Sequence, residues 1–300
     1  SVHSMDTETI ISIIEKRKTS AWYDEYEYFY EGIYQVALMN QFYESHLNSF
    51  HHVEAKDMWK AYTNDYYQMD TFYRNFHIAF STCLQTLHPS LDDAFKDLAD
   101  YVEKEYKNWY LDQLSSNWNK VIETDLGSTG RISGIAQQTD FYRDVVKNID
   151  GKVFVIISDA MRYDVAHSLA KQLEIETKAD VEISAQQGIY PTITKYGMAA
   201  LLPHKTLEVV ENNGTTKVLV DGHSSEMSDR DGILKSYSEN SVALRYKDII
   251  SMKRDDRRAA VKGKDIIYIY HDTIDASSHN DESSVFDACE KAINEIKNLV

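Results

Sequence analysis

The sequence is poor in proline, glycine and cysteine, and each shortage excludes a class of protein. Only 3 prolines and 11 glycines occur in 300 residues, which excludes a collagen-like chain and argues against long disordered segments. The 2 cysteines, Cys83 and Cys289, lie far apart and in no known metal-binding spacing. We therefore expect free thiols in a reducing cytoplasm instead of a disulfide framework.

Long apolar runs are also lacking. The longest runs, such as residues 153–157 and 198–202, fall far short of the roughly 20 residues that cross a bilayer. The first residues have no basic start followed by an apolar stretch, so they do not form a secretory signal. The sequence predicts a cytoplasmic protein that does not act in a membrane.

Positive charge is in the minority. The 32 Lys and Arg residues against 48 Asp and Glu give a formal net charge of -16, whereas nucleic-acid backbones are bound by clustered Lys and Arg. A nucleic-acid substrate would therefore need a local basic patch or metal ions. One basic run is interrupted by acidic residues, which favours a solvated helix face; its cations are Lys253, Arg254, Arg257, Arg258, Lys262 and Lys264.

The character of the sequence changes near Gly151. Before it, apolar residues recur every three or four positions, as in Trp22, Tyr26, Phe29 and Ile33, which indicates amphipathic helices. We predict an all-helical domain over residues 1–148, with tyrosine-rich faces used for packing. Helices are expected over residues 22–40, 55–77, 91–114 and 141–146, and a loop over 124–134.

After Gly151, strand and helix patterns alternate. The β-branched run over residues 152–158 is typical of a strand buried on both faces of a parallel sheet. We predict an α/β domain with a mostly parallel sheet over residues 149–300. Its other strands are expected at 181–185, 207–210, 218–220 and 265–270, and its helices at 161–173, 194–202 and 286–300. Because the last helix lacks a C-cap glycine, we expect the domain to be incomplete at its C-terminus.

Both central strands of this predicted sheet are followed by possible ligands. Asp159 follows the first strand, and His271, Asp272, Asp275 and His279 follow the last. Ligands bind at the carboxyl ends of strands in open α/β sheets, and Asp with His suits zinc or manganese. Taken singly, Asp159 could equally be a helix N-cap, and His279 could equally be a surface residue.

A threonine-containing segment lies between those strands. Thr192 and Thr194 precede a predicted helix, where unpaired backbone N–H groups favour an alkoxide. A threonine at a helix start can also be a simple cap, which is the more common role.

Three motifs in this order resemble the PglZ family of the alkaline phosphatase superfamily, from bacterial BREX phage-defence systems. They are Val-Ile-Ile-Ser-Asp-Ala-Met-Arg-Tyr-Asp ending at Asp164, Pro-Thr-Ile-Thr-Lys-Tyr-Gly beginning at Pro191, and Tyr-Ile-Tyr-His-Asp-Thr-Ile-Asp-Ala ending at Ala276. The segment that begins at Arg230 also resembles this family. The resemblance covers residues 141–300 and, more loosely, the helical half.

The resemblance implies a phosphatase or phosphodiesterase with two divalent metal ions, zinc or manganese. Thr194 would be the nucleophile and would bind one ion together with Asp159, while Asp275 and His279 would bind the other. Arg162, His271 and Asp272 are further candidates, and Thr192 would cap the helix. The superfamily's downstream Asp-His-Gly motif does not occur in this chain, so we expect little activity from this chain alone.

The resemblance also implies partners. These are other BREX components, such as the methyltransferase subunit, and a phosphate-ester substrate, which could be a nucleotide or a nucleic acid. A second function stays open at this point: a catalytically degenerate scaffold whose acidic helical half docks those components.

Overall fold

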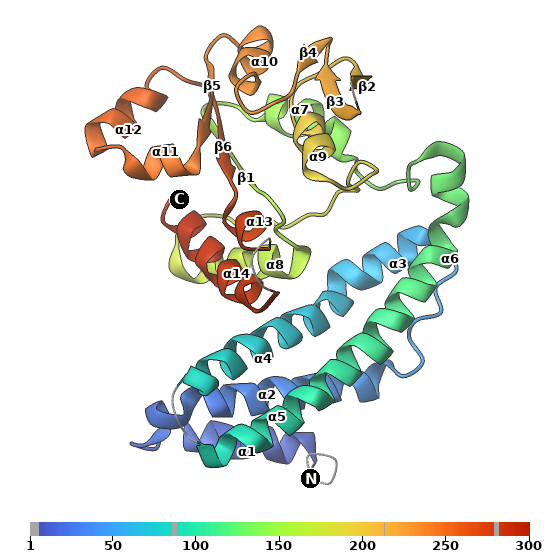
Figure 1. The fold of residues 1–300 in the computed structure, drawn as a ribbon, viewed down its shortest axis with the longest axis vertical. Coiled ribbons are helices and arrows are strands. Elements are labelled where there is room, and N and C mark those ends of the chain that lie inside the picture. The colour runs from blue at the N-terminus through green and yellow to red at the C-terminus, as the bar shows by residue number, and fades with distance from the viewer. Residues whose placement is uncertain (1–5, 86–88, 213, 279–281) are drawn as a thin grey trace. The chain divides into compact units, whose positions relative to one another are not determined.

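A computed structural model describes residues 6–85, 89–212, 214–278 and 282–300. These residues form two compact units, each assembled from separate parts of the chain (Figure 1). The helical unit takes residues 1–129, 162–183 and 280–293, and the sheet unit takes residues 130–161, 184–279 and 294–300.

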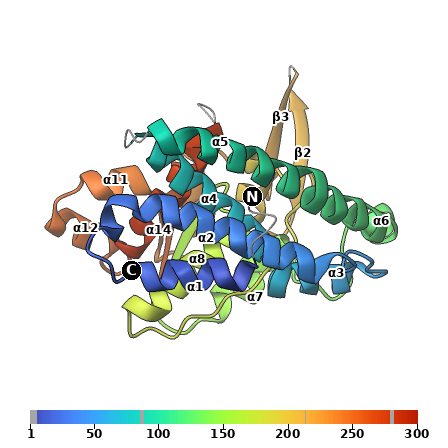
Figure 2. The same cartoon turned by 90° about the horizontal axis from the view of Figure 1, so that it is seen from below.

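Long helices build the helical unit. Several run alongside one another, notably α2 and α4 (Figures 1 and 2). The predicted helices over 22–40, 55–77 and 91–114 are confirmed, and the last two are interrupted by π-helical segments, η2 and η3. The bounds are α1 Thr7–Arg17, α2 Tyr23–His46, α3 Ala55–Ala61, η2 Tyr62–Tyr66, α4 Tyr67–Gln85, α5 Pro89–Glu103, η3 Lys104–Leu111, α6 Asp112–Thr129 and α8 Tyr163–Glu176. The first part of α14 (Glu282–Lys297) completes the unit.

The end of the helical unit's first segment differs from the expectation. The predicted loop over 124–134 is wrong in its first part, because α6 continues through Gly127 to Thr129. Glycine in a helix costs only about 1 kcal/mol relative to alanine, so one glycine did not end the helix. The domain division at residue 148 stays a prediction, since the helical unit also contains α8 and most of α14.

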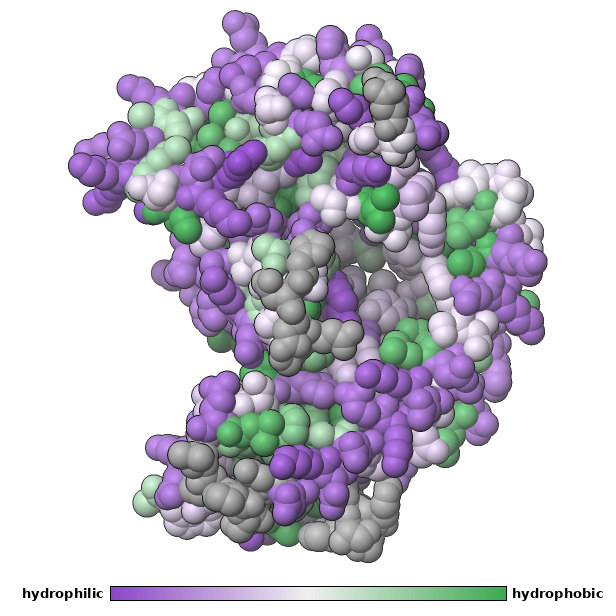
Figure 3. All heavy atoms as spheres, in the orientation of Figure 1, coloured by the Kyte–Doolittle hydropathy of each residue, from purple (hydrophilic) through white to green (hydrophobic). Residues whose placement is uncertain are grey.

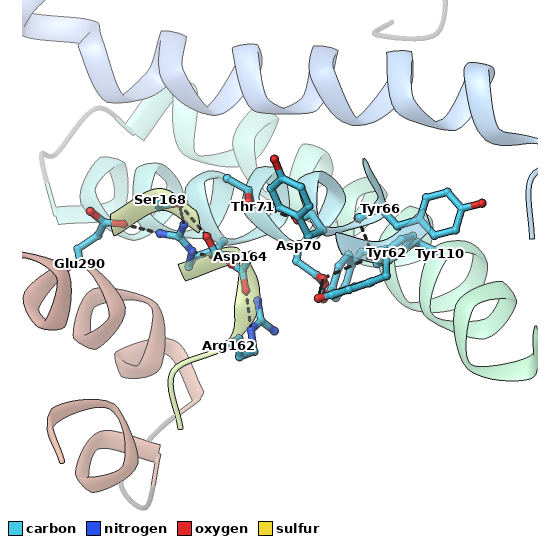
Figure 4. A network of polar contacts seen from close by, with 12 residues as sticks. Tyr62, Tyr66, Asp70, Thr71, Tyr110, Arg162, Asp164, Ser168 and Glu290 are labelled. Atoms are coloured by element: carbon cyan, nitrogen blue, oxygen red, sulfur yellow. Dashed lines mark hydrogen bonds and ion pairs between the residues drawn. The ribbon is translucent and has the colours of Figure 1, made fainter. Parts of the chain in front are cut away.

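A buried polar network lies inside the helical unit (Figure 4). Asp70 accepts hydrogen bonds from the hydroxyls of Tyr62, Tyr106 and Tyr110, at 2.7, 2.5 and 3.4 Å. These tyrosines come from the two π-helical segments. Burial raises the pKa of Asp70. The three donors supply the partners that a buried carboxylate requires.

The same network continues to α8 and α14 through Arg74. Its Nε donates to Asp164 Oδ2 at 3.1 Å, its Nη2 donates to Ser168 at 2.8 Å, and its Nη1 pairs with Glu290. Arg74 is 1% exposed and Asp164 is completely buried. Three helices, α4, α8 and α14, are therefore joined through the buried guanidinium of Arg74.

The sheet unit contains a parallel sheet in the order β1-β6-β5 and an antiparallel sheet in the order β2-β3-β4. The predicted α/β character and the parallel sheet are thus confirmed. Strand bounds are β1 Val153–Ser158, β2 Leu207–Asn212, β3 Thr215–Val220, β4 His223–Ser224, β5 Ser241–Arg245 and β6 Ile266–His271. Helix bounds are η4 Gln138–Asp140, α7 Phe141–Asp144, η5 Val146–Asn148, α9 Thr194–Ala200, α10 Arg230–Tyr237, α11 Tyr246–Ser251, α12 Arg254–Val261 and α13 Thr273–Ser278.

Apolar side chains cover both faces of the parallel sheet, although not evenly. One cluster includes Val155, Met198 and Tyr268, and another includes Tyr246 and Ile267. The central strand β6 is buried almost throughout. The prediction that 152–158 is buried on both faces is wrong, because β1 is an edge strand and its Phe154 is 51% exposed.

One predicted strand does not form. Residues 181–185 are irregular, and only Gln187 beyond them makes an isolated bridge, to Gln137. A strand needs a partner for its backbone groups, so a β-branched composition alone does not make one. The hairpin over residues 207–220 is confirmed: β2 and β3 pair antiparallel, and Gly214 near the turn has a φ of +73°.

The exposed surface is predominantly hydrophilic on the face drawn in Figure 3, where hydrophobic residues form small separate groups. Throughout the described ranges, no helix combines the length and hydropathy that a membrane crossing requires.

Candidate active site

Asp159 lies directly beyond the carboxyl ends of two paired parallel strands. Ser158 at the end of β1 is in register with His271 at the end of β6, and the Asp159 amide donates to the His271 carbonyl at 2.8 Å. Ala160 then adopts a left-handed φ of 62°, which turns the chain out of the sheet. Helix α8 begins only at Tyr163, with Arg162 at its N-cap. Asp159 is therefore not a helix cap, which leaves its carboxylate for another role.

Thr194 is the first residue of α9, and its side chain is exposed. The N-cap position is occupied by Ile193, with no side-chain hydrogen bond to the helix. The prediction that Thr192 caps this helix is therefore wrong, and so is the alternative that Thr194 does. Buried Met198, Ala199 and Ala200 fix the other end of α9 in the core.

Asp159, Thr194 and Asp275 line one pocket of about 460 Å³. Asp275 comes from the first turn of α13, directly after β6. Burial raises the pKa of Asp159, and the charge of Asp275 raises it further, while the Thr194 hydroxyl and Arg230 act in the opposite direction. A carboxylate whose ionisation is opposed by burial and by a neighbouring carboxylate is stabilised by a bound cation.

A second pocket, of about 290 Å³, shares Asp159, Thr194 and Met198 with the first. Arg230, Arg245 and Lys247 also line it, together with Asp272. The Arg230 guanidinium lies 4.5 Å from the centre of the Tyr270 ring, and its Nε donates to the Ser225 carbonyl at 3.0 Å. Thr194 thus lines one pocket with Asp159 and Asp275 and a second pocket with three cations. That arrangement suits chemistry on an anionic group.

These cations were not among the candidates drawn from the sequence. Arg245 ends β5 and Lys247 follows it by two residues, but β5 was not predicted, so nothing placed them at a sheet edge. Arg230 carried one signal, because it begins a segment that resembles the PglZ family. Lys247 pairs with Asp272 at 2.8 Å, so the carboxylate of Asp272 already has a partner at the pocket wall.

Three other candidates have different surroundings. His271 is 1% exposed, and both ring nitrogens are engaged, Nδ1 with Ser158 at 2.9 Å and Nε2 with Glu295 at 2.8 Å. Arg162 belongs to the helical unit, where its Nε donates to Asp164 at 3.0 Å. His279 lies outside the described residues.

The donor atoms present fit part of a cation site. Asp159, Asp275 and Thr194 offer oxygen ligands, which suit a hard divalent ion such as manganese or magnesium. In the part of the chain that the structure describes, no cluster of three or more His, Cys, Asp and Glu side chains could hold a metal ion. The described residues therefore do not complete two metal sites by themselves.

Comparison with known proteins places the chain in a family. A family model described as the "BREX system PglZ alkaline phosphatase-like domain" matches residues 140–300. The chain is 35% identical over 309 aligned positions to "Alkaline phosphatase-like protein BrxZ" of Escherichia coli O9:H4 (strain HS), covering 99% of this chain and 35% of that protein. It is 36% identical over 302 positions to "Alkaline phosphatase-like protein PglZ" of Bacillus cereus (strain H3081.97), covering 98% and 34%.

This chain spans about a third of the length of these curated relatives. No solved structure matches it.

Proposed function

The chain belongs to the PglZ family of BREX alkaline phosphatase-like domains, and we propose that it carries the nucleophile and part of the metal site of a phosphate-ester hydrolase. The observation that carries this proposal is the shared pocket of Asp159, Thr194 and Asp275. A hydroxyl that shares one pocket with two carboxylates and another with cations is what transfer of a phosphoryl group to a protein nucleophile requires.

In the proposed reaction, Thr194 Oγ1 attacks the phosphorus of the ester. A bond forms between Thr194 and phosphorus while the bond to the leaving alcohol breaks, and that alcohol takes up a proton from solvent. The proton of the threonine hydroxyl leaves to the water that fills the pocket. Water then attacks the phosphothreonine, releases the phosphate product and restores the hydroxyl.

Arg230, Arg245 and Lys247 would bind the non-bridging oxygens of the phosphate group. Their support is that they line, together with Thr194 and Asp159, the second pocket. Negative charge accumulates on these oxygens as the reaction proceeds, so fixed cations there lower the barrier. Arg230 is the best supported of the three, because its contacts with Tyr270 and Ser225 hold its guanidinium in place.

Divalent metal ions complete the proposal. Asp159 and Thr194 would hold one ion and Asp275, with His279, would hold a second; zinc and manganese are the candidates. Bound ions would lower the pKa of the threonine hydroxyl and offset the charge of the phosphate group. The support is the like-charge pair of carboxylates, which a cation would stabilise.

The wider setting is also a proposal. The protein would act in the cytoplasm with other BREX components, such as the methyltransferase subunit, on a nucleotide or nucleic-acid phosphate ester. The family name supports this setting. The competing function is a scaffold that docks those components without turnover.

A hydrolysis assay on the complete natural chain tests the proposal. We expect p-nitrophenyl phosphate or bis(p-nitrophenyl) phosphate to be cleaved after addition of manganese or zinc, and chelation to abolish cleavage. Asp159→Asn and Asp275→Asn should each lower the rate about 100-fold or more, since each removes a metal ligand. Asp255→Asn, the same change on exposed α12, is the matched control.

Wild-type turnover by both pocket variants would show that the reaction occurs elsewhere. If the complete chain cleaves neither ester with any metal but still assembles with BREX components, the scaffold function replaces the enzyme.

A further inference from the structure

A third pocket of the sheet unit, of about 590 Å³, is rich in positive charge although the chain is strongly acidic. Four of its lining residues are Lys or Arg, and Asp140 is the only carboxylate among those that line it in the described structure. The cations are Arg131, Arg143, Lys147 and Lys205. They come from separate segments, so folding gathers them into one basic pocket.

The carboxylates around this basic pocket are already occupied. Arg143 pairs with Asp140 at 3.2 Å and with Asp144 at 2.6 Å, and Arg131 approaches Asp140 at 3.9 Å. Lys147 and Lys205, by contrast, form no side-chain ion pair with any residue that the structure describes. Two ammonium groups are thus free to bind an anion from outside the chain.

Two aromatic rings lie beside these cations. Tyr142 and Tyr237 meet edge to face, with ring centres 6.2 Å apart. The Tyr237 hydroxyl donates to Asp221, whose other oxygen accepts from the backbone amides of Lys205 and Thr206 at 2.9 and 2.8 Å. These bonds fix the Tyr237 ring, which stays 38% exposed. A ring held open to solvent is a stacking surface for a planar group.

The basic pocket adjoins, along the chain, the pocket of Asp159, Thr194 and Asp275, which we call the reaction pocket. Gln138 lines the reaction pocket and the next residue, Thr139, lines the basic pocket. In the same way, residues 188 and 201 line the reaction pocket, and the residues that follow them, 189 and 202, line the basic pocket. Consecutive residues of three segments therefore line the two pockets.

We propose that this basic pocket binds a nucleotide unit, with its phosphate at Lys147 and Lys205 and its base against Tyr237. Cations beside an exposed aromatic ring match both parts of a nucleotide, the anionic phosphate and the flat base. An acidic peptide would use the same cations but has no need of the ring. The inference goes beyond hydrolysis and does not depend on it, because binding is measured without turnover.

The test is fluorescence anisotropy of a short labelled single-stranded DNA with the complete chain, in chelator to prevent turnover. The double variant Lys147→Ala, Lys205→Ala should weaken binding at least about tenfold and reduce its salt dependence. Tyr237→Leu should weaken it about tenfold through lost stacking. Tyr237→Phe keeps the ring but loses the hydroxyl bond to Asp221, so it should bind more tightly than Tyr237→Leu.

The matched control is the double variant Arg254→Ala, Arg258→Ala on α12, which makes the same change in net charge outside the pocket. Unlabelled AMP is then added as a competitor. If AMP displaces the DNA, the pocket binds a free nucleotide; if it does not, binding requires several linked phosphates of a strand. Either result supports the pocket. Equal losses in the control variant would overturn the proposal. It would also be overturned if Tyr237→Leu had no effect while polyglutamate displaced the DNA, since that pattern identifies a surface for acidic proteins.

Discussion

Arg230 connects the chemistry of the two pockets that meet at Thr194. Its positive charge lowers the pKa of Asp159, and its guanidinium is held by the Tyr270 ring and the Ser225 carbonyl. A cation fixed in this way loses little freedom when a phosphate group binds. For this reason we assign it a larger share of the reaction than exposed Arg245 or Lys247.

Arg230→Gln should lower phosphate-ester hydrolysis about 100-fold. The neutral amide cannot balance the charge that develops on the phosphate oxygens, so the loss should fall mainly on kcat. Steady-state kinetics on the complete chain measures it, with Arg254→Gln as an exposed arginine control. An unchanged kcat would remove Arg230 from the reaction.

At this scale, strand-end positions and the family motifs predicted which carboxylates lie together. Asp159 and Asp275 were expected at one sheet edge, and they line one pocket. The basic side of the site was not predicted, because charge complementarity depends on which loops meet in space. Thr192 does not cap α9, because Ile193 occupies the N-cap position. A sequence pattern does not fix the start of a helix to one residue.

At the scale of elements, the buried Arg74–Asp164 pair explains how α4 and α8 are joined. Both side chains are buried. Burying an ion pair costs free energy, and removing only one member of a buried pair costs more. Removing one partner leaves the other with a single, partly exposed counter-charge, Glu290 for Arg74 and Arg162 for Asp164, which compensates a buried charge less well.

Asp164→Leu should therefore destabilise the protein by about 3–5 kcal/mol. The double variant Arg74→Leu, Asp164→Leu should lose less than the sum of the two single variants, because no buried charge remains on either side. Urea denaturation followed by circular dichroism measures all four forms. Additive losses would mean that the pair contributes no coupling energy.

Long periodic elements were the predictable ones. Hydrophobic patterns predicted α2, α4 and the central strand β6, because the apolar residues of these elements are buried in a core. Strand β5 is short and was missed, and residues 181–185 were taken for a strand that has no partner. The π-helical segments η2 and η3 have no periodic signature. Their tyrosines are hydrogen-bonded to buried Asp70, a contact that hydrophobic periodicity does not predict.

At the scale of the whole molecule, the two units do not follow chain order. The helical unit draws Asp164, Ser168 and Glu290 from beyond residue 148 to satisfy Arg74. The predicted domain boundary can therefore be tested by expressing residues 1–148 alone.

We expect that fragment to be less stable by at least about 3 kcal/mol than the same residues in the full sequence, because Arg74 would lose every buried acidic partner. Arg74→Leu in the fragment should recover part of the loss, and thermal unfolding measured by circular dichroism compares the two. A fragment as stable as the full sequence would support a domain that ends near residue 148.

The most direct test of the central claim is to look for a phosphoryl group on Thr194. The complete chain, loaded with manganese or zinc, is mixed with a phosphate ester and quenched in acid, and the peptide that spans Thr192 and Thr194 is sequenced by mass spectrometry. We predict phosphate on Thr194 in the wild type, none in Thr194→Ala, loss of nearly all turnover in Thr194→Ala, and retained turnover in Thr192→Ala. Full turnover by Thr194→Ala, with the peptide unmodified in every sample, would contradict the account.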